Sequence, residues 1–192
     1  MEEVIVSEIF KNITLSSVEI SKISSGFTKL EIKKGVIIMK ANEFVLHQYF
    51  VSKGCLRAFF VNQQGKEHTV QFAVKDWWIS DYTAFFSSSK GILQIECLQD
   101  ATLYKLSREN MERFYVEIPK LESFFRKKME KAFAGFQKRI LGNLALSAKE
   151  RYVTFTHTYP SIEQNVKNYH IASYLGITTE SLSRIRKEIA TS

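Results

Sequence analysis

The chain has 192 residues, of which 45% are hydrophobic and 24% are charged, with only eight Gly and two Pro. This composition is typical of a folded protein and excludes a chain that is mainly disordered. No stretch approaches the ~20 consecutive apolar residues of a membrane-spanning helix, and acidic residues at positions 2 and 3 stand where a secretory signal would be basic. We therefore expect a cytoplasmic protein with no membrane partner.

The net charge of +7 is confined to the C-terminal part of the chain. Residues 1–118 hold equal numbers of basic and acidic side chains, whereas residues 119–192 hold 13 Lys and Arg against 6 Asp and Glu. A basic terminal region indicates a polyanionic partner, either a nucleic acid or an anionic membrane surface. A merely solvated basic helix would give the same count, so the motifs have to decide.

The N-terminal part of the chain predicts two short helices followed by strands. Residues 4–13 have helical spacing, and a second helix is expected from Ser16. Between residues 30 and 106, short β-branched and aromatic runs predict an antiparallel β sandwich or barrel. Gly35, Gly54 and Gly65 are expected at turns that require a positive φ. The expected strands cover residues 36–39, 44–51, 56–61, 68–72, 92–97 and 102–106.

After residue 106 the apolar period changes from two to about 3.6, which predicts helices to the end of the chain. Ser107 is a suitable N-cap for a first short helix through Phe114, and residues 119–146 predict one long amphipathic helix. The apolar stripe of that helix is long enough to pair with a second copy, although it could also pack inside its own monomer. We expect the dimer interface at Leu121, Phe125, Met129, Ala132, Phe136 and Ile140. A capping box, Ser147 to Glu150, begins the next helix.

Residues 168–187 read NYHIASYLGITTESLSRIRK and predict two short helices separated by Gly176. This spacing is typical of a helix-turn-helix, in which a glycine takes the turn and a small residue, here Ala172, lies where the helices cross. An ordinary helical hairpin with no binding role is the alternative. The residues expected to fill the inner faces are Ile171, Leu175, Ile177, Leu182 and Ile185.

The second helix, residues 179–189, follows a natural N-cap at Thr178 and presents a polar outer face. On that face an arginine can bond a guanine bidentately, and Glu180 can accept from a cytosine amino group. Glu180 could instead only stabilise the positive end of the helix dipole. Arg186 and Lys187 are expected to contact phosphates. The complete predicted DNA-binding set is Thr179, Glu180, Ser181, Ser183, Arg184, Arg186 and Lys187.

A β sandwich, a long helix and a terminal helix-turn-helix together resemble the Crp/Fnr family of bacterial transcription regulators. The run from Glu180 to Arg184 is similar to the E-x-x-S-R pattern of the Fnr branch, which implies that Glu180, Ser183 and Arg184 read a TTGA-like half-site in a palindrome. The resemblance implies an α+β chain with an antiparallel β-roll (jelly roll) of the cyclic-nucleotide-binding type at residues 1–118. It also implies a dimerisation helix at residues 119–146 and a DNA-binding domain at residues 147–192. The half-sites would lie about one helical turn, near 34 Å, apart.

The sequence departs from this family where an effector would bind. Cyclic-nucleotide-binding members carry a Gly-Glu pair and an arginine in a phosphate cassette, and residues 76–90 contain neither. We therefore do not expect cyclic AMP as a ligand, and no cofactor is identified. Because no cysteine precedes Cys55, we also do not expect the iron–sulfur cluster of the oxygen-sensing branch. The aromatic segment either fills the sandwich core or lines an apolar effector pocket through Trp77, Trp78, Tyr82, Phe85 and Lys90.

Two other functions compete with a homodimer that binds double-stranded DNA and, if it activates transcription, RNA polymerase. A cupin-like metalloenzyme would need several His ligands on neighbouring strands, and the sandwich offers only His47 and His68. We therefore expect neither a metal nor an enzyme. A ligand-binding module could use its helix-turn-helix to contact a protein instead of DNA. The two cysteines, Cys55 and Cys97, are too few for a disulfide framework and are expected in the core.

Overall fold

The computed structural model describes residues 3–191, so the acidic residue at position 2 lies outside it. The described chain forms two compact units, Met1–Ala58 with Gln71–Glu130 and Phe59–Val70 with Lys131–Ser192. The helices are α1 (Glu3–Ile9), α2 (Ser17–Ser25), α3 (Tyr82–Ser87), α4 (Arg108–Glu117), α5 (Lys120–Ala145), α6 (Ala148–Thr158), α7 (Pro160–Asn165), α8 (Asn168–Leu175) and α9 (Thr179–Ala190). The strands are β1 (Phe27–Ile32), β2 (Ile37–Met39), β3 (His47–Lys53), β4 (Cys55–Val61), β5 (Glu67–Val74), β6 (Trp77–Ile79), β7 (Gln94–Cys97) and β8 (Ala101–Ser107).

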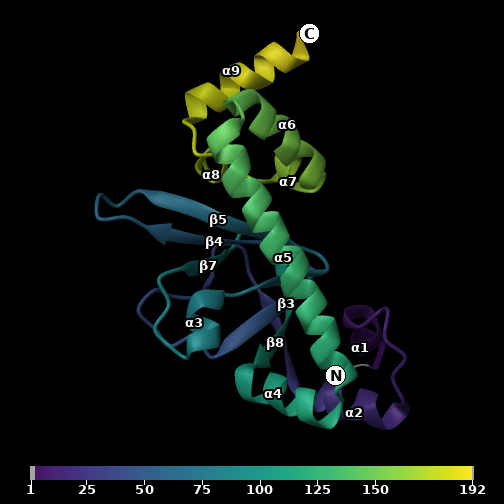
Figure 1. Ribbon diagram of the computed structural model, residues 1–192. Coiled ribbons are helices and arrows are strands. Elements are labelled where there is room, and N and C mark those ends of the chain that lie inside the picture. The colour runs from purple at the N-terminus through teal and green to yellow at the C-terminus, as the bar shows by residue number, and fades with distance from the viewer. Residues whose placement is uncertain (1–2, 192) are drawn as a thin grey trace. The chain divides into compact units, whose positions relative to one another are not determined.

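The eight strands form two four-stranded sheets, which confirms the predicted α+β class and the antiparallel β-roll (Figure 1). One sheet has the order β1-β8-β3-β6 and the other β2-β7-β4-β5. In the first sheet β8 pairs antiparallel with both β1 and β3, so that Leu106 lies opposite Phe27 on one side and Gln48 on the other. Four elements were not among those expected from the sequence, the strands β1 and β6 and the helices α3 and α7.

Local signals place several of the element boundaries. Ser16 caps α2 by accepting from the backbone N–H of Glu19, whose carboxylate bonds back to Ser16 in a complete capping box. Ser107 caps α4 in the same way by accepting from the N–H of Asn110. The hairpin loop between β4 and β5 turns at Gly65, whose φ is 76°. These caps and turns confirm the expectations based on residue type.

The core of the first unit is aromatic. Trp78 on β6 lies with its ring centroid 5.4 Å from that of Phe50 and 5.3 Å from that of Phe125 at the start of α5. Phe10 of the N-terminal segment lies 4.9 Å from the half-buried ring of Phe124, also on α5. The first turns of the long helix are therefore part of the core of the β-roll.

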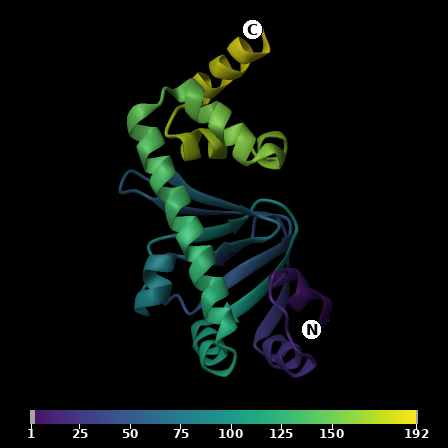
Figure 2. The ribbon, with the colours of Figure 1, turned by 45° about the vertical axis from the view of Figure 1, so that its right-hand side comes forward.

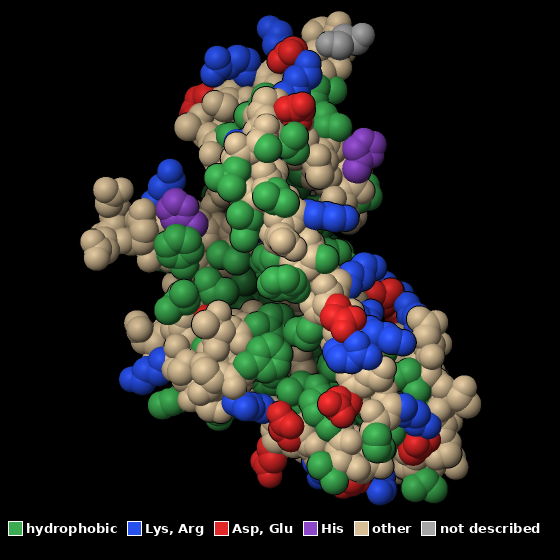
Figure 3. All heavy atoms as spheres, viewed as in Figure 1, with side chains coloured by type: hydrophobic (Ala, Val, Ile, Leu, Met, Phe, Trp, Pro, Cys, Tyr) green, Lys and Arg blue, Asp and Glu red, His purple; other side chains and the backbone are tan. Residues whose placement is uncertain are grey.

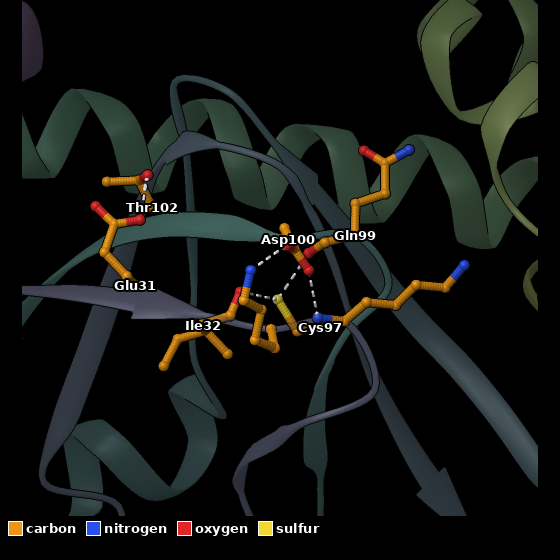
Figure 4. Close-up of polar contacts among 8 residues, drawn as sticks. Glu31, Ile32, Cys97, Gln99, Asp100 and Thr102 are labelled. Atoms are coloured by element: carbon orange, nitrogen blue, oxygen red, sulfur yellow. Dashed lines mark hydrogen bonds and ion pairs between the residues drawn. The ribbon is translucent and has the colours of Figure 1, made fainter.

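Both cysteines, Cys55 and Cys97, are buried and free, as expected for core residues. The Sγ of Cys97 donates to the backbone carbonyl of Gln99 at 3.0 Å (Figure 4). The carboxylate of Asp100, the residue after Gln99, accepts from the Lys33 ammonium at 2.7 Å. Burial is the main cause that raises the pKa of the Cys55 thiol to about 12 and that of Cys97 to about 11. Both groups are therefore neutral thiols near pH 7.

Candidate nucleic-acid interface

Helices α8 and α9 form a helix-turn-helix whose turn follows the predicted residues. Gly176 ends α8 in the left-handed conformation, with a φ of 68°, and its N–H bonds to the carbonyls of Ala172 and Ser173. Thr178 then caps α9 by accepting from the N–H of Ser181 at 3.2 Å. The start of α9 is therefore fixed by two separate local interactions, a glycine C-cap and a threonine N-cap.

The inner faces of the two helices pack together as the spacing predicts. All but one of the expected apolar residues are buried, and Ile177 in the turn is half-buried. His170 is also buried, with 3% of its surface exposed, which the sequence pattern did not indicate. The buried residues of α8 and α9 are His170, Ile171, Ala172, Leu175, Leu182 and Ile185.

The outer face of α9 carries four exposed polar side chains, Glu180, Ser183, Arg184 and Lys187. They follow one another at intervals of three, one and three residues, so they share one side of the helix. Figures 1 and 2 both show α9 with a long side that no other helix of its own unit covers. This face can therefore approach an extended partner without rearrangement of the helix-turn-helix.

Glu180 is held at the N-terminus of α9 as a carboxylate. The hydroxyl of Thr179 donates to its Oε1 at 3.1 Å. The pKa of Glu180 is lowered by hydrogen bonds, first from its own backbone N–H and then from Thr178 and Thr179. Thr179 and Ser181 are half-buried and take part in these local contacts. They therefore serve the cap of α9 and are less accessible to a ligand than the four residues of the outer face.

Arg186, one of the expected DNA contacts, bonds through its guanidinium to other residues of the same unit. Its Nε donates to the Tyr152 hydroxyl at 3.1 Å, and its Nη2 lies 3.0 Å from Oε1 of Glu163. Its Nη1 donates to the side-chain carbonyl of Asn168. One arginine thus ties α9 to α6, α7 and α8 at once. Arg186 is a structural residue of this unit, and Lys187 beside it remains exposed.

Two of the residues expected at the dimer interface on α5 are instead buried by their own chain. Leu121 and Phe125, with 0% and 4% of their surface exposed, belong to the core of their own unit. They cannot meet a second copy, because the β-roll already covers them. Ala132 and Ile140 are exposed, and Met129 and Phe136 are half-buried. Figure 3 shows hydrophobic side chains along the visible side of α5, and the most exposed of them are Phe133, Ile140, Leu141 and Leu144.

The residues expected to line an effector pocket do not form one surface. Trp78 and Phe85 are core residues, with 8% and 0% of their surface exposed. The Tyr82 hydroxyl donates to the buried side chain of Gln48 at 3.4 Å. Trp77 is 37% exposed and belongs to the first sheet. The aromatic segment is therefore mainly core, and it does not assemble the predicted apolar site.

Two other features of the β-roll bear on ligand binding. Lys90, also expected in the pocket, is exposed and lies 6.0 Å from the ring centroid of Phe44. A cavity of about 530 Å³ opens elsewhere in the same unit, and Lys29, Lys53 and Lys75 are among the residues that line it. The ammonium groups of Lys29 and Lys75 are paired, with Glu31 at 3.0 Å and Glu8 at 3.2 Å. Lys53 is exposed, and no ion pair of its side chain is described.

Residues 3–191 contain neither a cluster of metal-binding side chains nor a membrane-spanning helix. In this range no three His, Cys, Asp or Glu side chains lie together in an arrangement that could hold a metal ion. No helix in the same range is both long enough and apolar enough to cross a bilayer. His68, one of the two histidines considered as a ligand, stacks on Phe60 at a centroid distance of 4.8 Å.

Comparison with known proteins agrees with this geometry. The family model for the cyclic nucleotide-binding domain matches residues 29–117, which contain all eight strands except the first two residues of β1. FixK2 from Bradyrhizobium japonicum superposes with a TM-score of 0.74 at 18% identity, covering 86% of this chain and 85% of that one. A protein from Eubacterium rectale, named as a transcriptional regulator of the crp/fnr family, gives 0.71 at 20% identity over 92% and 84% of the two chains. The chain has the Crp/Fnr fold.

A third protein with this fold is named for the small molecule to which it responds. CLP from Xanthomonas campestris, a c-di-GMP responsive global regulator, superposes with a TM-score of 0.73 at 12% identity over 92% of both chains. No curated protein matches the chain by sequence. The TM-scores of 0.71–0.74 show a shared Crp/Fnr fold. Because the identities are only 12–20%, the function has to be argued from the residues of this chain.

Proposed function

We propose that this protein is a homodimeric regulator of transcription that binds double-stranded DNA sequence-specifically through α9. The observation that carries the proposal is the contrast between the two sides of this helix. Its inner side is fixed by the buried Leu182 and Ile185 and by Arg186, whereas its outer side carries four exposed polar residues and no internal ion pair among them is described. A rigid helix with an unused polar face is what readout in the major groove requires.

The four residues of the outer face have distinct roles in this proposal. Arg184 donates to O6 and N7 of a guanine, and Glu180 accepts from the amino group of a cytosine. Ser183 lies between them and bonds a base edge or a phosphate. Lys187, one turn further along, contacts the phosphate backbone without regard to sequence. The lowered pKa of Glu180 supports its role as an acceptor, because the carboxylate stays ionised near neutral pH.

Dimerisation supplies the second recognition helix. The exposed stripe of α5 contains Phe133, Ile140 and Leu144, which are 72%, 57% and 80% exposed. Large apolar side chains repeated along one helix are unfavourable in water, and pairing with the same stripe of a second chain would cover them. A twofold axis through this contact predicts a palindromic site whose half-sites lie about one helical turn apart.

The proposal includes no role for cyclic AMP. The β-roll has the fold of a cyclic nucleotide-binding domain, but the Gly-Glu pair and the arginine of nucleotide-binding relatives are absent from residues 76–90. In this region Asp81 is buried and accepts from the backbone N–H groups of Ile92 and Leu93 at 2.9 and 3.1 Å. Its carboxylate therefore shapes a loop. RNA polymerase is a further partner if the protein activates, and the cytoplasm is the expected site of action.

Fluorescence anisotropy with two labelled duplexes tests the proposal. One duplex carries inverted TTGA half-sites one helical turn apart, and the other has the same composition in scrambled order. We expect the wild-type protein to bind the first about a thousandfold more tightly at moderate salt. Arg184→Ala should cost about 1–3 kcal/mol per half-site on the first duplex only.

Lys187→Ala is the matched control for that variant, since it removes a charge from the same face. It should weaken binding to both duplexes alike and lower the salt slope by about one per protomer. A wild-type protein that binds neither duplex, or an equal loss on both duplexes for Arg184→Ala, would contradict the assignment of α9 as a reading helix.

A further inference from the structure

The tip of the β4–β5 hairpin, residues 59–70, belongs to the same compact unit as the helix-turn-helix. Ser173 of α8 makes two hydrogen bonds with this tip. Its Oγ accepts from the backbone N–H of Thr69 at 2.9 Å and donates to the backbone carbonyl of Glu67 at 3.0 Å. One hydroxyl thus satisfies a donor and an acceptor of the β5 backbone, as a neighbouring strand would.

Arg139 of α5 joins the same contact from another direction. Its Nη1 donates to the backbone carbonyl of Val70. Its guanidinium carbon lies 4.9 Å from the ring centroid of Tyr174, the residue that follows Ser173 on α8. We call the set Glu67, Thr69, Val70, Arg139 and Ser173 the hairpin clamp. It connects a strand end, the long helix and the first helix of the helix-turn-helix.

Two polar atoms of the hairpin clamp are buried without a hydrogen-bond partner among the described residues, Oγ1 of Thr69 and Nε of Arg139. Thr69 is only 5% exposed, so its hydroxyl has lost water without gaining a replacement. Each such atom offsets roughly the gain from one of the hydrogen bonds that the clamp makes. The net contribution of the clamp to stability is therefore small, so a single substitution can change how often it opens.

The closed clamp leaves the outer face of α9 exposed, with Glu180 and Arg184 accessible. We infer that Ser173 and Arg139 are positioning residues, which hold α8, and α9 with it, in the orientation that DNA binding selects. This inference rests on the proposed DNA-binding function.

Two substitutions change the clamp in opposite directions. Ser173→Ala removes both hydrogen bonds of the hydroxyl and should favour the open form. Thr69→Val keeps the backbone N–H but replaces the buried unsatisfied hydroxyl by a methyl group of similar size, so it should favour the closed form. Ser25→Ala is a matched control, because the Ser25 hydroxyl bonds only the Lys22 carbonyl of its own helix, α2.

Amide hydrogen exchange of the free full-length protein tests the contact without DNA. A fivefold shift from an even balance of open and closed forms raises the open fraction from a half to about five sixths. We therefore expect exchange at the Thr69 amide to become about 1.7-fold faster in Ser173→Ala and slower in Thr69→Val, with no change in Ser25→Ala. Unchanged exchange in Ser173→Ala would show that the clamp does not form. Thermal unfolding of each variant checks that the protein is still folded.

Anisotropy with the inverted TTGA duplex then tests the positioning role. From an even balance of open and closed forms, a fivefold shift predicts about threefold weaker binding for Ser173→Ala and up to about twofold tighter binding for Thr69→Val, per protomer. Affinity changes of the same sign in both variants, or none despite altered exchange, would overturn the inference. If the wild-type protein discriminates no duplex, the proposed function fails and this inference with it, while the exchange data still decide whether the clamp exists.

Discussion

Arg186→Ala should destabilise the helix-turn-helix unit while leaving its outer face chemically intact. The wild-type guanidinium bonds Tyr152 at 3.1 Å and pairs with Glu163 at 3.0 Å, and it also bonds Asn168. The side chains of Arg186 and Glu163 are 25% and 27% exposed, so the pair lies between the surface and buried cases. We therefore expect a loss of about 2 kcal/mol, more than the 0–1 of a surface pair and less than the 3–5 of a fully buried one.

Urea unfolding followed by circular dichroism measures this loss, and thermal unfolding should show a decrease of about 8–16 °C in the melting temperature for a unit of this size. Arg184→Ala is the matched control, because Arg184 is exposed on the same helix and should change stability by less than about 0.5 kcal/mol. Arg186→Lys should be intermediate, since lysine keeps the charge but loses the planar fork. Equal stability of the Arg186→Ala and Arg184→Ala variants would refute the structural role of Arg186.

Three further predictions concern the long helix and the core. Ile140→Asp should convert the dimer to a monomer, because it places a charge in the exposed apolar stripe of α5. Analytical ultracentrifugation measures the molar mass, and an unchanged molar mass would exclude this stripe as the interface. Cys55 and Cys97 should resist alkylation by iodoacetamide at pH 8 until urea is added, because their raised pKa values of about 12 and about 11 keep both thiols neutral. Rapid alkylation of the native protein would contradict their burial. Gly26→Ala should lower the free energy of unfolding in urea by about 1–3 kcal/mol, because the added Cβ would lie 2.3 Å from a ring carbon of Phe114. An unchanged unfolding midpoint would show that the ring has room to move.

Features with local causes were predictable from the sequence. Thr178 and Gly176 fix the two ends of the turn between α8 and α9 through their own side chain or backbone freedom, and the structure places both as expected. The capping box from Ser147 to Glu150 likewise begins α6. The composition of the β segment indicated the strands for the same reason, since residues at alternating positions share one face.

Features that depend on distant packing were not predictable. The stripe of α5 looks the same along its whole length, but only the β-roll decides that Leu121 and Phe125 are buried by their own chain. Arg186 lies next to the outer face of α9, and its partners are on α6, α7 and α8, which no pattern in the sequence locates. The contact of Ser173 with the hairpin tip joins residues more than 100 positions apart, so no local signal exists for it.

Selection of bound sequences from a pool of random duplexes tests the central claim most directly, because it assumes no target site. The recovered sequences should converge on an inverted repeat whose half-sites lie about one helical turn apart. The Arg184→Ala protein should lose the preference at a single base pair of each half-site. Recovery of no common sequence, or of a single unrepeated half-site, would contradict a twofold regulator that reads DNA through α9.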